Sequence, residues 1–356
     1  MDKKAIVIVD FNGSSPTYTH YFSMPFSKQG HKVQILGHRN AEDLKIYKET
    51  LPYIGFKTPS KLLNYFLNWS LLLLKAKSFD VIHIQWLQFL KFSSFELWCL
   101  RLLKARNKQV FYTVHNIYPH NESRKKIKRR YDRLYALLNN LVVHTEATAT
   151  RFTTKYPDKK IIKIDHGLFY SGFGALDIPE EPQMAMLGMI SPYKGYEDVL
   201  LAMKEMKKGA KQFSLHIEGS GNPEYIAQLR EKIKALDLDE VVTIKEGYIK
   251  VDRLIALYKK SFVTLMPYKK IEQSGVLFTS FGLNVPVVGY NVGGVQDVLR
   301  DKIYGRLVEK GNIEAFIEAV YWTYEHKKTL HEKLKKNEYR YLWDNTATTL
   351  LKHYFS

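Results

Sequence analysis

Cysteine is almost absent from the sequence, and so are long hydrophobic runs. Cys99 is the single cysteine in 356 residues, which excludes an internal disulfide framework and a cysteine-rich metal site. It lies in the apolar stretch ELWCLRLL, where buried packing is favoured over a role as a nucleophile.

The longest apolar stretches, such as LNWSLLLL, are shorter than the roughly 18–20 residues that span a bilayer. The opening MDKKAIVIVD is typical of a buried strand that ends at Asp10, not of a signal peptide. We therefore expect a cytoplasmic protein, either soluble or peripheral at the inner face of the membrane.

Acidic residues are scarce relative to basic ones, so the formal net charge is +18. A field of this sign attracts anions such as nucleotides, phospholipid surfaces, nucleic acid or acidic polysaccharide. No standard nucleic-acid-binding module is visible, so nucleic acid is not the expected partner. The densest basic cluster precedes Tyr131, Leu134 and Tyr135 at helical spacing, and is either a solvated helix face or a surface for an anionic membrane or acceptor. Its residues are Arg124, Lys125, Lys126, Lys128, Arg129 and Arg130.

The length of the chain suits two domains of roughly 150–190 residues each. Short apolar segments rich in Val and Ile alternate with helical segments, which predicts an α/β protein with two Rossmann-like halves. The stretch 168–183, which contains Gly, Pro and acidic residues, interrupts this alternation and is interpreted as a linker. We predict strands at 5–10, 32–37, 79–86, 108–116, 139–145 and 160–167 before it, and at 184–190, 213–219, 241–249, 261–268, 285–290 and 305–311 after it.

Residues that follow the predicted strands are candidates for the site, because ligands bind beyond the carboxyl ends of parallel strands. Gly13 and Ser14 follow the first strand, in a turn that either places backbone amides against a phosphate or is an ordinary turn. His115 leaves a later strand and either binds a sugar hydroxyl and moves a proton, or is simply packed. Trp86 offers an aromatic face to a sugar ring, or is packed, and His120 is a second candidate contact for sugar or acceptor.

Two further turns lie in the C-terminal half, each between a predicted strand and a helix. In the first, Gly188 permits close approach of the backbone and Lys194 is either a point charge for a pyrophosphate or a solvated lysine. In the second, Ser274 and Gly275 open a helix and form an anion-binding nest, and Glu272 just before them could accept hydrogen bonds from ribose or sugar hydroxyls. Two phosphate-binding turns in one domain favour a diphosphate ligand.

The order of these motifs resembles that of the retaining glycosyltransferases of family 4. The resemblance spans nearly the whole chain and implies the GT-B fold, in which two Rossmann-like domains have parallel sheets that face each other across a cleft. It implies an acceptor domain of residues 1–170 with a crossover helix at about 338–356, and a donor domain of residues 171–337. The motifs are Thr-Val-His-Asn at 113–116, Gly-x-x-x-Pro-Tyr-Lys-Gly at 188–195, Glu-Gly-Ser-Gly at 218–221, Ser-Gly-Val-Leu at 274–277 and Val-Gly-Gly-Val at 292–295.

The same resemblance implies roles for the motif residues around a nucleotide-sugar donor. His115 would lie near the reacting face of the sugar, Lys194 would hold the diphosphate, and Glu272 would complete the catalytic set. No metal or other cofactor is expected, because positive side chains and helix dipoles offset the charge of the leaving group. The donor-binding set would be Gly13, Ser14, Gly188, Glu218, Gly219, Tyr248, Ser274, Gly275, Val276 and Leu277, with Tyr248 against the nucleobase.

The activity implied is transfer of a sugar from a UDP- or GDP-sugar to a glycan or lipid-linked acceptor, with retention through a front-face displacement. The sequence departs from the family pattern at two places. Met189 and Ser191 stand where an arginine is often found, and the second glutamate of the usual pair is replaced by Thr279 or Ser280. The alternatives are an inverting transferase, a nucleotide-sugar epimerase on the same scaffold, or a catalytically weak protein that binds acidic glycan or nucleic acid.

Overall fold

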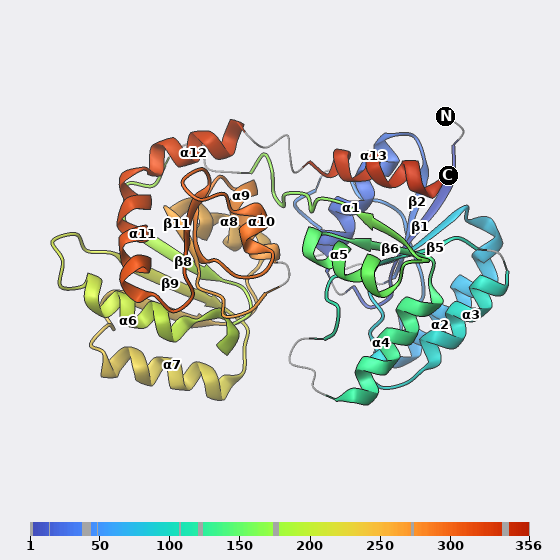
Figure 1. The fold of residues 1–356 in the computed structure, drawn as a ribbon, viewed down its shortest axis with the longest axis horizontal. Helices are drawn as coiled ribbons and strands as arrows, with labels where there is room; N and C mark the ends of the chain where they lie inside the picture. Colours follow the sequence, from blue (N-terminus) through green and yellow to red (C-terminus); the bar gives the residue numbers. More distant parts are fainter. Residues whose placement is uncertain are drawn as a thin grey trace. The chain divides into compact units, whose positions relative to one another are not determined.

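The chain folds into two compact units, each built on its own parallel sheet. The computed structural model describes residues 3–13, 15–37, 44–47, 49–106, 108–119, 124–173, 178–271, 274–336 and 342–355. The first unit contains Met1–Gly167 and Leu342–Ser356, and the second contains Leu168–Tyr341. Figure 1 shows each unit as a sheet with helices packed around it. In the sequence, the second unit is therefore an insertion between two segments of the first.

The sheet of the first unit has seven strands over its described residues, and every pairing is parallel. The strand order is β3-β2-β1-β4-β5-β6-β7, so the chain first moves outward from β1 and then returns to the other side of β1. The strands are β1 (Ala5–Asp10), β2 (Lys32–Gly37), β3 (Tyr53–Ile54), β4 (Val81–Ile84), β5 (Val110–Thr113), β6 (Asn140–Val143) and β7 (Lys160–Lys163).

Helices cover both faces of this sheet. All four residues of β4 are buried, and successive residues of a strand point to opposite faces, so neither face is open to solvent. Tyr65 and Trp69 on α2 are fully buried in the same core as the strand residues Val9 and Ile84. The helices are α1 (Pro16–Lys28), α2 (Lys61–Lys75), α3 (Phe95–Ala105), α4 (Lys125–Leu137) and α5 (Glu146–Lys155), with short 3₁₀ turns η1 (Ala76–Ser78) and η2 (Phe89–Lys91).

A last helix, α13 (Trp343–Tyr354), returns to the first unit and packs on α1 (Figure 1). The ring of Trp343 fills the space beside Gly167, where a Cβ would lie 2.3 Å from the indole. The hydroxyl of Tyr354 is hydrogen-bonded to Nδ1 of His83, and the hydroxyl of Thr346 donates to the carbonyl oxygen of Asp165 at 2.7 Å. Both ends of the helix are thus held by buried contacts.

The second unit repeats this architecture with a six-stranded parallel sheet over its described residues. Its strand order is β10-β9-β8-β11-β12-β13, which again places the first strand of the series beside the fourth. The strands are β8 (Gln183–Leu187), β9 (Ser214–Gly219), β10 (Val242–Glu246), β11 (Val263–Met266), β12 (Val287–Tyr290) and β13 (Gly305–Val308).

The core of the second unit is made by β8, β9, β11 and β12 together with helices on both faces. Val199, Leu200 and Met203 of α6 and Ala319 and Val320 of α11 are buried in it. The helices are α6 (Tyr196–Met206), α7 (Pro223–Ala235), α8 (Val251–Lys260), α9 (Gly275–Gly282), α10 (Val295–Val298), α11 (Ile313–Glu325) and α12 (Lys327–Lys336), and the 3₁₀ turn η3 (Pro192–Lys194) precedes α6. Within the described residues, no helix is long and apolar enough to cross a membrane.

All twelve predicted strands are present, mostly shortened by a few residues. The structure adds β3, a two-residue strand that the sequence analysis missed. The predicted linker is partly wrong, because its first residues are buried: Leu168, Phe169 and Tyr170 are each less than a tenth exposed. The amide of Phe169 donates to the carbonyl oxygen of Phe278 on α9 at 3.3 Å, so these residues belong to the second unit.

The turn after β9 depends on a glycine, and this gives a test of the fold. A Cβ on Gly219 would lie 1.6 Å from the carbonyl oxygen of Gly188, whereas one on Gly275 would make an ordinary 3.5 Å contact with Phe169. We expect Gly219→Ala to destabilise the protein by about 2 kcal/mol or more, because backbone must move. Gly275→Ala should change stability by less than about 0.5 kcal/mol. Urea unfolding of the two variants measures both, and equal midpoints would contradict the packing described here.

Candidate functional site

The order of strands in the second unit marks one place as suited to a ligand. β8 lies beside β11, and the chain leaves these two strands toward opposite sides of the sheet. At such a switch point the loops diverge beyond the carboxyl ends of the strands and leave room for a ligand. The loop after β8 contains Gly188 and Lys194, and the loop after β11 leads to Ser274 and Gly275. The two predicted phosphate-binding turns therefore follow the two strands at the switch point.

The two loops are bound tightly to each other. The amide of Lys269 donates to the carbonyl oxygen of Tyr193 at 2.7 Å. Gly195, with φ 75°, lies so close to the other loop that a Cβ would be 2.1 Å from the carbonyl oxygen of Pro267. A glycine at this position permits both the left-handed backbone and the close approach. The position of η3, and with it Lys194, is thus fixed relative to the loop after β11.

Lys194 is the one charged side chain that this arrangement buries among the described residues of the two loops. Its side chain is 4% exposed, and burial lowers the pKa of its ammonium group to about 8. Nζ lies 5.4 Å from the centre of the Tyr268 ring, and no carboxylate within the described residues forms an ion pair with it. A buried cation without a carboxylate partner is costly, so the site favours an anion.

The start of α9 lies next to this ammonium group. A Cβ on Gly188 would be 3.8 Å from Nζ of Lys194 and 3.8 Å from Cγ2 of Val276. Ser274 is the N-cap of α9, but its side chain makes no capping hydrogen bond, and Gly275 is exposed. The first amides of a helix have no acceptor inside the helix and carry partial positive charge. The ammonium group of Lys194 and a side chain in the first turn of α9 therefore both lie close to Gly188.

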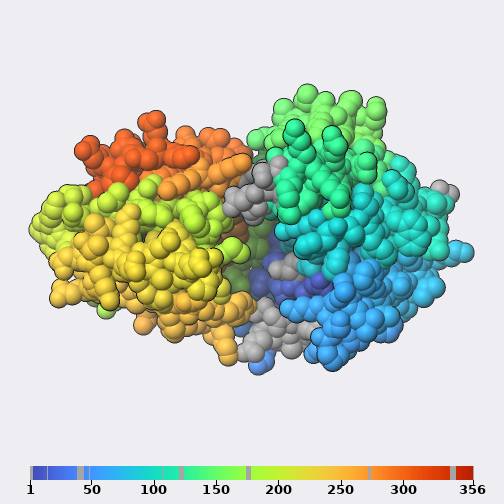
Figure 2. All heavy atoms as spheres, turned by 90° about the horizontal axis from the view of Figure 1, so that it is seen from below, coloured from blue at the N-terminus to red at the C-terminus, as the bar shows by residue number. Residues whose placement is uncertain are grey.

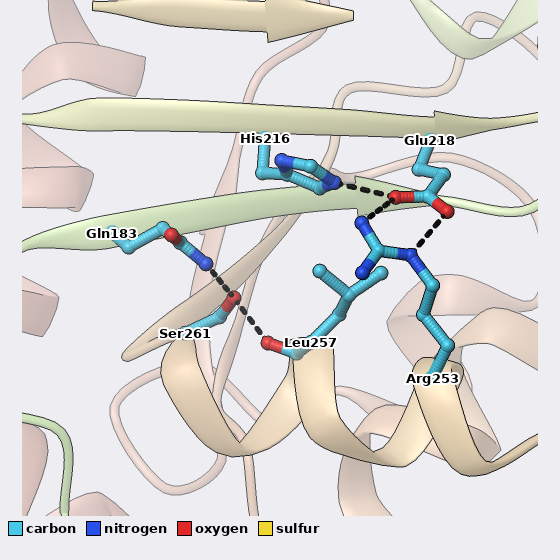
Figure 3. Close-up of polar contacts among 6 residues, drawn as sticks. All are labelled: Gln183, His216, Glu218, Arg253, Leu257 and Ser261. Atoms are coloured by element: carbon cyan, nitrogen blue, oxygen red, sulfur yellow. Dashed lines mark hydrogen bonds and ion pairs between the residues drawn. The ribbon is translucent and has the colours of Figure 1, made fainter. Parts of the chain in front are cut away.

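Glu218, at the end of β9, is occupied by other side chains. Figure 3 shows its carboxylate between Arg253 and His216. Nε and Nη2 of Arg253 donate to its two oxygens at 2.7 Å each, and Nε2 of His216 lies 2.8 Å from Oε2. The hydrogen bonds from Arg253 hold the pKa of this carboxyl at about 2, with a smaller contribution from His216. The carboxylate thus anchors the turn and leaves backbone groups to face a ligand.

The turns after β8, β9 and β10 are joined edge to edge through their backbones. The amide of Gly188 donates to the carbonyl oxygen of Glu218 at 3.0 Å, and the amide of Gly247 donates to that of Gly219 at 3.0 Å. Tyr248, directly after Gly247, is 67% exposed. An exposed aromatic ring on a turn that is held in this way presents a flat surface for stacking a nucleobase or another ring.

In the first unit, Trp86 and His115 meet at the carboxyl ends of β4 and β5. Their rings are stacked, with centres 4.4 Å apart and planes 4° from parallel. Nε2 of His115 lies 3.3 Å from Oε1 of Gln85, a fully buried side chain. Because a carbonyl oxygen only accepts, this assignment of the amide places a proton on Nε2 and leaves Nδ1 as an acceptor. Burial, and then the nearby His144, lowers the pKa of His115 well below its ordinary value.

The structure adds three rings to this pair that the sequence analysis missed. The ring of Tyr18 on α1 lies 4.8 Å from that of His115, and its hydroxyl lies 3.0 Å from Nε2 of His144. The rings of His144 and His166 are 5.4 Å apart. His144 directly follows β6, so the rule that selected His115, position just after a strand, could have selected it as well. Burial lowers the pKa of both added histidines, so they are neutral at pH 7.

The structure gives fewer contacts for the remaining candidate residues. Gly13 has φ 61° and its amide donates to the carbonyl oxygen of Asp10 at 3.1 Å, in the turn before α1. Asp10 itself is buried and accepts from the hydroxyl of Thr19 at 3.0 Å. Three candidates, Ser14, His120 and Glu272, lie outside the described residues. Among the residues that are described, no cluster of His, Cys, Asp or Glu could hold a metal ion.

The basic cluster forms α4, and its charged residues differ in their surroundings. Ile127, Tyr131, Leu134 and Tyr135 are buried against the first unit. The guanidinium of Arg130 donates through Nη1 to the carbonyl oxygens of Leu90 and Lys91 at 3.3 and 2.8 Å, and so holds η2. Nζ of Lys128 lies 5.7 Å from the centre of the Tyr118 ring. The exposed basic residues of the cluster are Arg124, Lys125, Lys126 and Arg129.

Two family models together match most of the chain. The model described as glycosyl transferases group 1 matches residues 173–341, and the model described as glycosyltransferase family 4 matches residues 15–168. The first model covers the loops that carry Lys194 and the start of α9, and the second covers the sheet that carries His115. This chain is a glycosyltransferase of the group 1 family.

Known proteins are related to this glycosyltransferase at low identity. An uncharacterised glycosyltransferase of Haemophilus influenzae is 25% identical over 183 residues, which are 51% of this chain and 50% of that protein. The match thus spans about half the length of this curated relative. A sucrose-phosphate synthase of Thermosynechococcus elongatus has the same fold, with a TM-score of 0.74 at 17% identity over 99% of this chain and 98% of that chain.

Two further solved structures agree with the fold. A glycosyltransferase of Rickettsia africae has a TM-score of 0.75 at 18% identity, over 99% of this chain and 98% of that one. HepE of Anabaena, solved with UDP and glucose, has a TM-score of 0.73 at 12% identity, over 98% of both chains. The predicted α/β architecture of the GT-B type is confirmed for this glycosyltransferase by these matches.

Lys194 gives a direct test of the anion site of the glycosyltransferase. Lys194→Met keeps the apolar stem and removes the charge, so we expect affinity for a nucleoside diphosphate to fall about 10- to 100-fold. Wild-type affinity should also weaken between pH 7 and 9, because the ammonium group, with its pKa of about 8, must be protonated to bind the anion. Titration calorimetry with UDP, GDP and ADP measures both effects.

The control for this variant is Lys204→Met, which removes an exposed lysine from α6 of the same unit. Its affinity and its pH dependence should equal those of the wild type. The Lys194→Met protein should show a smaller fall in affinity above pH 8 than the wild type. Unchanged binding of all three nucleotides by Lys194→Met would remove Lys194 from the site.

The ion pair between Arg253 and Glu218 predicts a dependence of stability on acid. The folded carboxyl has a pKa of about 2 in place of its ordinary 4.5, so the pair stabilises the fold above pH 4.5 and loses this effect as the pH falls toward 2. Arg253→Met should therefore lower the free energy of unfolding at pH 7, and the difference from wild type should shrink between pH 4.5 and 2. Urea unfolding at several pH values measures it. A difference that is constant over this range would contradict the assignment.

Proposed function

We propose that this glycosyltransferase transfers a sugar from a nucleotide-diphosphate sugar to a glycan or lipid-linked acceptor, with retention at the anomeric carbon. The observation that carries the proposal is that the buried ammonium group of Lys194 and the first turn of α9 both lie beside Gly188. A buried ammonium group and the backbone amides at a helix start complement the two phosphates of a nucleoside diphosphate, and they do so at the switch point where α/β sheets bind ligands. Glu272, in the same loop, lies outside the described residues and keeps its proposed role in binding donor hydroxyls.

We propose a UDP-sugar as the first donor to test, with a GDP-sugar as the second. HepE, whose fold is shared, was solved with UDP and glucose. Tyr248 is the proposed stacking surface for the base, because it is 67% exposed and its turn is bound to that of Gly219. The donor site thus consists of the turns after β8, β9, β10 and β11. Its residues are Gly188, Lys194, Glu218, Gly219, Tyr248, Ser274, Gly275, Val276 and Leu277.

The reaction proposed is a front-face displacement. The acceptor hydroxyl oxygen forms a bond to the anomeric carbon, while the bond from that carbon to the phosphate breaks and its electron pair goes to the nucleoside diphosphate. The proton of the acceptor hydroxyl passes to the departing phosphate. Lys194 and the α9 amides stabilise the negative charge that grows on this phosphate, which is where fixed donors accelerate the reaction most. No protein carboxylate has to act as a nucleophile.

Trp86 and His115 form the proposed sugar-binding surface of the first unit. The stacked rings offer an apolar face and a neutral imidazole, both suited to a pyranose ring and its hydroxyls. Asp10 is a poor base for an inverting reaction, because it is 2% exposed and its carboxylate already accepts from Thr19. Contact of the basic residues of α4 with anionic lipid is also part of the proposal.

The proposal is tested by turnover of a panel of UDP-, GDP- and ADP-sugars. We expect slow donor hydrolysis with one base, and loss of this activity by about 10²-fold or more in Lys194→Met, with Lys204→Met as the unchanged control. Proton NMR of the product reports the anomer: the same configuration as the donor indicates retention, and the opposite configuration would support an inverting enzyme. His115→Gln should lower transfer and leave UDP or GDP affinity unaltered. A wild-type protein that turns over none of these donors would contradict the proposal.

A further inference from the structure

One surface of the first unit is used by neither the fold nor the proposed site. The outer faces of α2, η2 and α3 expose large apolar side chains that would normally be buried. We call this set the apolar face; its members, with exposed fractions, are Leu62 (50%), Leu63 (49%), Phe66 (39%), Leu74 (81%), Phe92 (74%) and Trp98 (54%). Single exposed apolar residues are ordinary, but a contiguous group of this size marks a surface that something covers.

Helix α2 shows this exposure of apolar side chains most clearly. Its sequence KLLNYFLNWSLLLLK has charged residues only at its two ends, Lys61 and Lys75. The inner side is accounted for by Tyr65 and Trp69, which are fully buried in the core. A helix that faced water with its other side would have charged residues there. Instead that side carries Leu62, Leu63, Phe66 and Leu74 around one exposed serine, Ser70, so α2 has an uncharged and largely apolar side that is open to solvent.

Ring contacts join the parts of the apolar face into one surface. The ring of Phe95 lies 4.9 Å from that of Phe66 on α2 and 6.2 Å from that of Trp98 on α3. The ring of Phe89 in η2 lies 6.0 Å from Phe66 and 6.0 Å from Phe92. Figure 2 shows the blue, cyan and blue-green segments of the first unit, which include α2, α3 and α4, side by side on one face.

The buried carboxyl group of Glu96 connects α3 with α2 and η2 beneath the apolar face. Oε1 of Glu96, a fully buried residue of α3, accepts hydrogen bonds from the hydroxyl of Tyr65 on α2 and, at 3.2 Å, from the amide of Phe89 in η2. Burial raises the pKa of this carboxyl to about 8, so it is largely uncharged at pH 7. The apolar face is thus built on a rigid base and gains no negative charge from it.

Basic residues outnumber acidic ones on the described parts of α2, α3 and α4. Arg130 ties α4 to η2 through the carbonyl oxygens of Leu90 and Lys91. The only carboxylates that the described parts of α2, α3 and α4 contain are that of Glu96, which is buried, and that of Asp132, which is paired with Lys155 at 2.6 Å. The exposed basic residues around the face are Lys61, Lys75, Lys91, Arg101, Lys125, Lys126, Arg129 and Arg133.

We propose that the apolar face docks into the interfacial layer of an anionic lipid bilayer, with α2 lying in the plane of the membrane and α4 over the headgroups. Leu, Phe and Trp on one side with Lys and Arg around them are the composition of a helix that lies at a membrane interface. The uniform positive charge complements anionic lipid, each Lys or Arg near the surface adding to the attraction. At 1.5 Å per residue, α2 presents about 22 Å of such surface.

This surface extends the lipid contact of α4 in the proposed function, and it is made of residues separate from the donor and sugar sites. None of its members belongs to the second unit or to the stacked pair of Trp86 and His115. Nucleotide affinity and hydrolysis of water-soluble donors therefore stay unchanged when the apolar face is altered. Failure of membrane docking and failure of glycosyl transfer are thus distinguishable in the same set of proteins.

The first experiment is co-sedimentation of the full chain with vesicles of phosphatidylcholine alone or with about one-third phosphatidylglycerol. We expect binding to the anionic vesicles, weakened but not abolished by high salt, because screening removes the charge contribution and leaves the apolar one. Replacing Lys125, Lys126 and Arg129 with serine should weaken binding about a hundredfold at low salt. The matched control replaces three exposed lysines of the second unit, Lys204, Lys234 and Lys259, with serine and should bind nearly as the wild type does.

The second experiment separates insertion from charge alone. The variant Leu74→Gln, Phe92→Ser and Trp98→Gln changes only exposed side chains, so it should fold normally and lose binding about tenfold or more at high salt. Leu201→Gln, at an exposed leucine on α6, is its control. Brominated lipids should quench tryptophan fluorescence of the wild type, and Trp98→Phe should lose most of that quenching. Each folded variant is checked by its unaltered UDP or GDP affinity.

Two results would overturn the proposal. One is equal vesicle binding by the wild type and by the variant of the apolar face, together with no quenching from Trp98. The other is absence of vesicle binding by a wild-type protein that self-associates in light scattering, with the association lost in the variant. The second result would assign the apolar face to contact between two copies of this chain.

Discussion

The buried ammonium group of Lys194 is the main electrostatic constraint on the candidate site of the second unit. The side chain of Lys194 is enclosed by the loops after β8 and β11, and no described carboxylate offsets its charge. Removing a cation from water in this way costs free energy, which packing elsewhere in the unit offsets. Under the proposed function, an anion that enters beside it offsets this cost and accepts hydrogen bonds from backbone amides at the start of α9. The unoffset charge therefore favours binding of an anion at this position.

Backbone contacts rather than side chains keep this arrangement in place. Gly195 and Gly219 each bring two turns closer than any side chain would allow. The bidentate pair of Glu218 and Arg253 then fixes the end of β9 from outside. A site made in this way tolerates changes in the residues that contact a base or a sugar, because the phosphate-binding part is held by the chain itself. This agrees with low sequence identity to structures of the same fold.

The sequence predicts the sheets well because buried parallel strands are short, continuous apolar runs. It predicts Lys194 and Ser274 as neighbours because the rule about strand ends applies to both loops. It does not predict β3, which has two residues, or the partnership of Arg253 with Glu218, which only tertiary packing brings together. The outer side of α2 also escapes prediction, since an apolar run looks alike whether it is covered by protein or not. Roles for Ser14, His120 and Glu272 stay predictions because the described residues do not include them.

The return of α13 to the first unit affects the order in which the protein matures on the ribosome. The whole second unit emerges before α13 does, so its sheet can close while the first unit still lacks a helix. Until then the rings of Tyr18 and Phe22 on α1 lack their contact with Trp343. In the folded protein the ring of Trp343 lies 5.2 Å from that of Tyr18 and 6.2 Å from that of Phe22. A nascent chain thus lacks the partner of these two rings until α13 has emerged. Completion of the first unit therefore depends on a segment that is synthesised after the whole second unit.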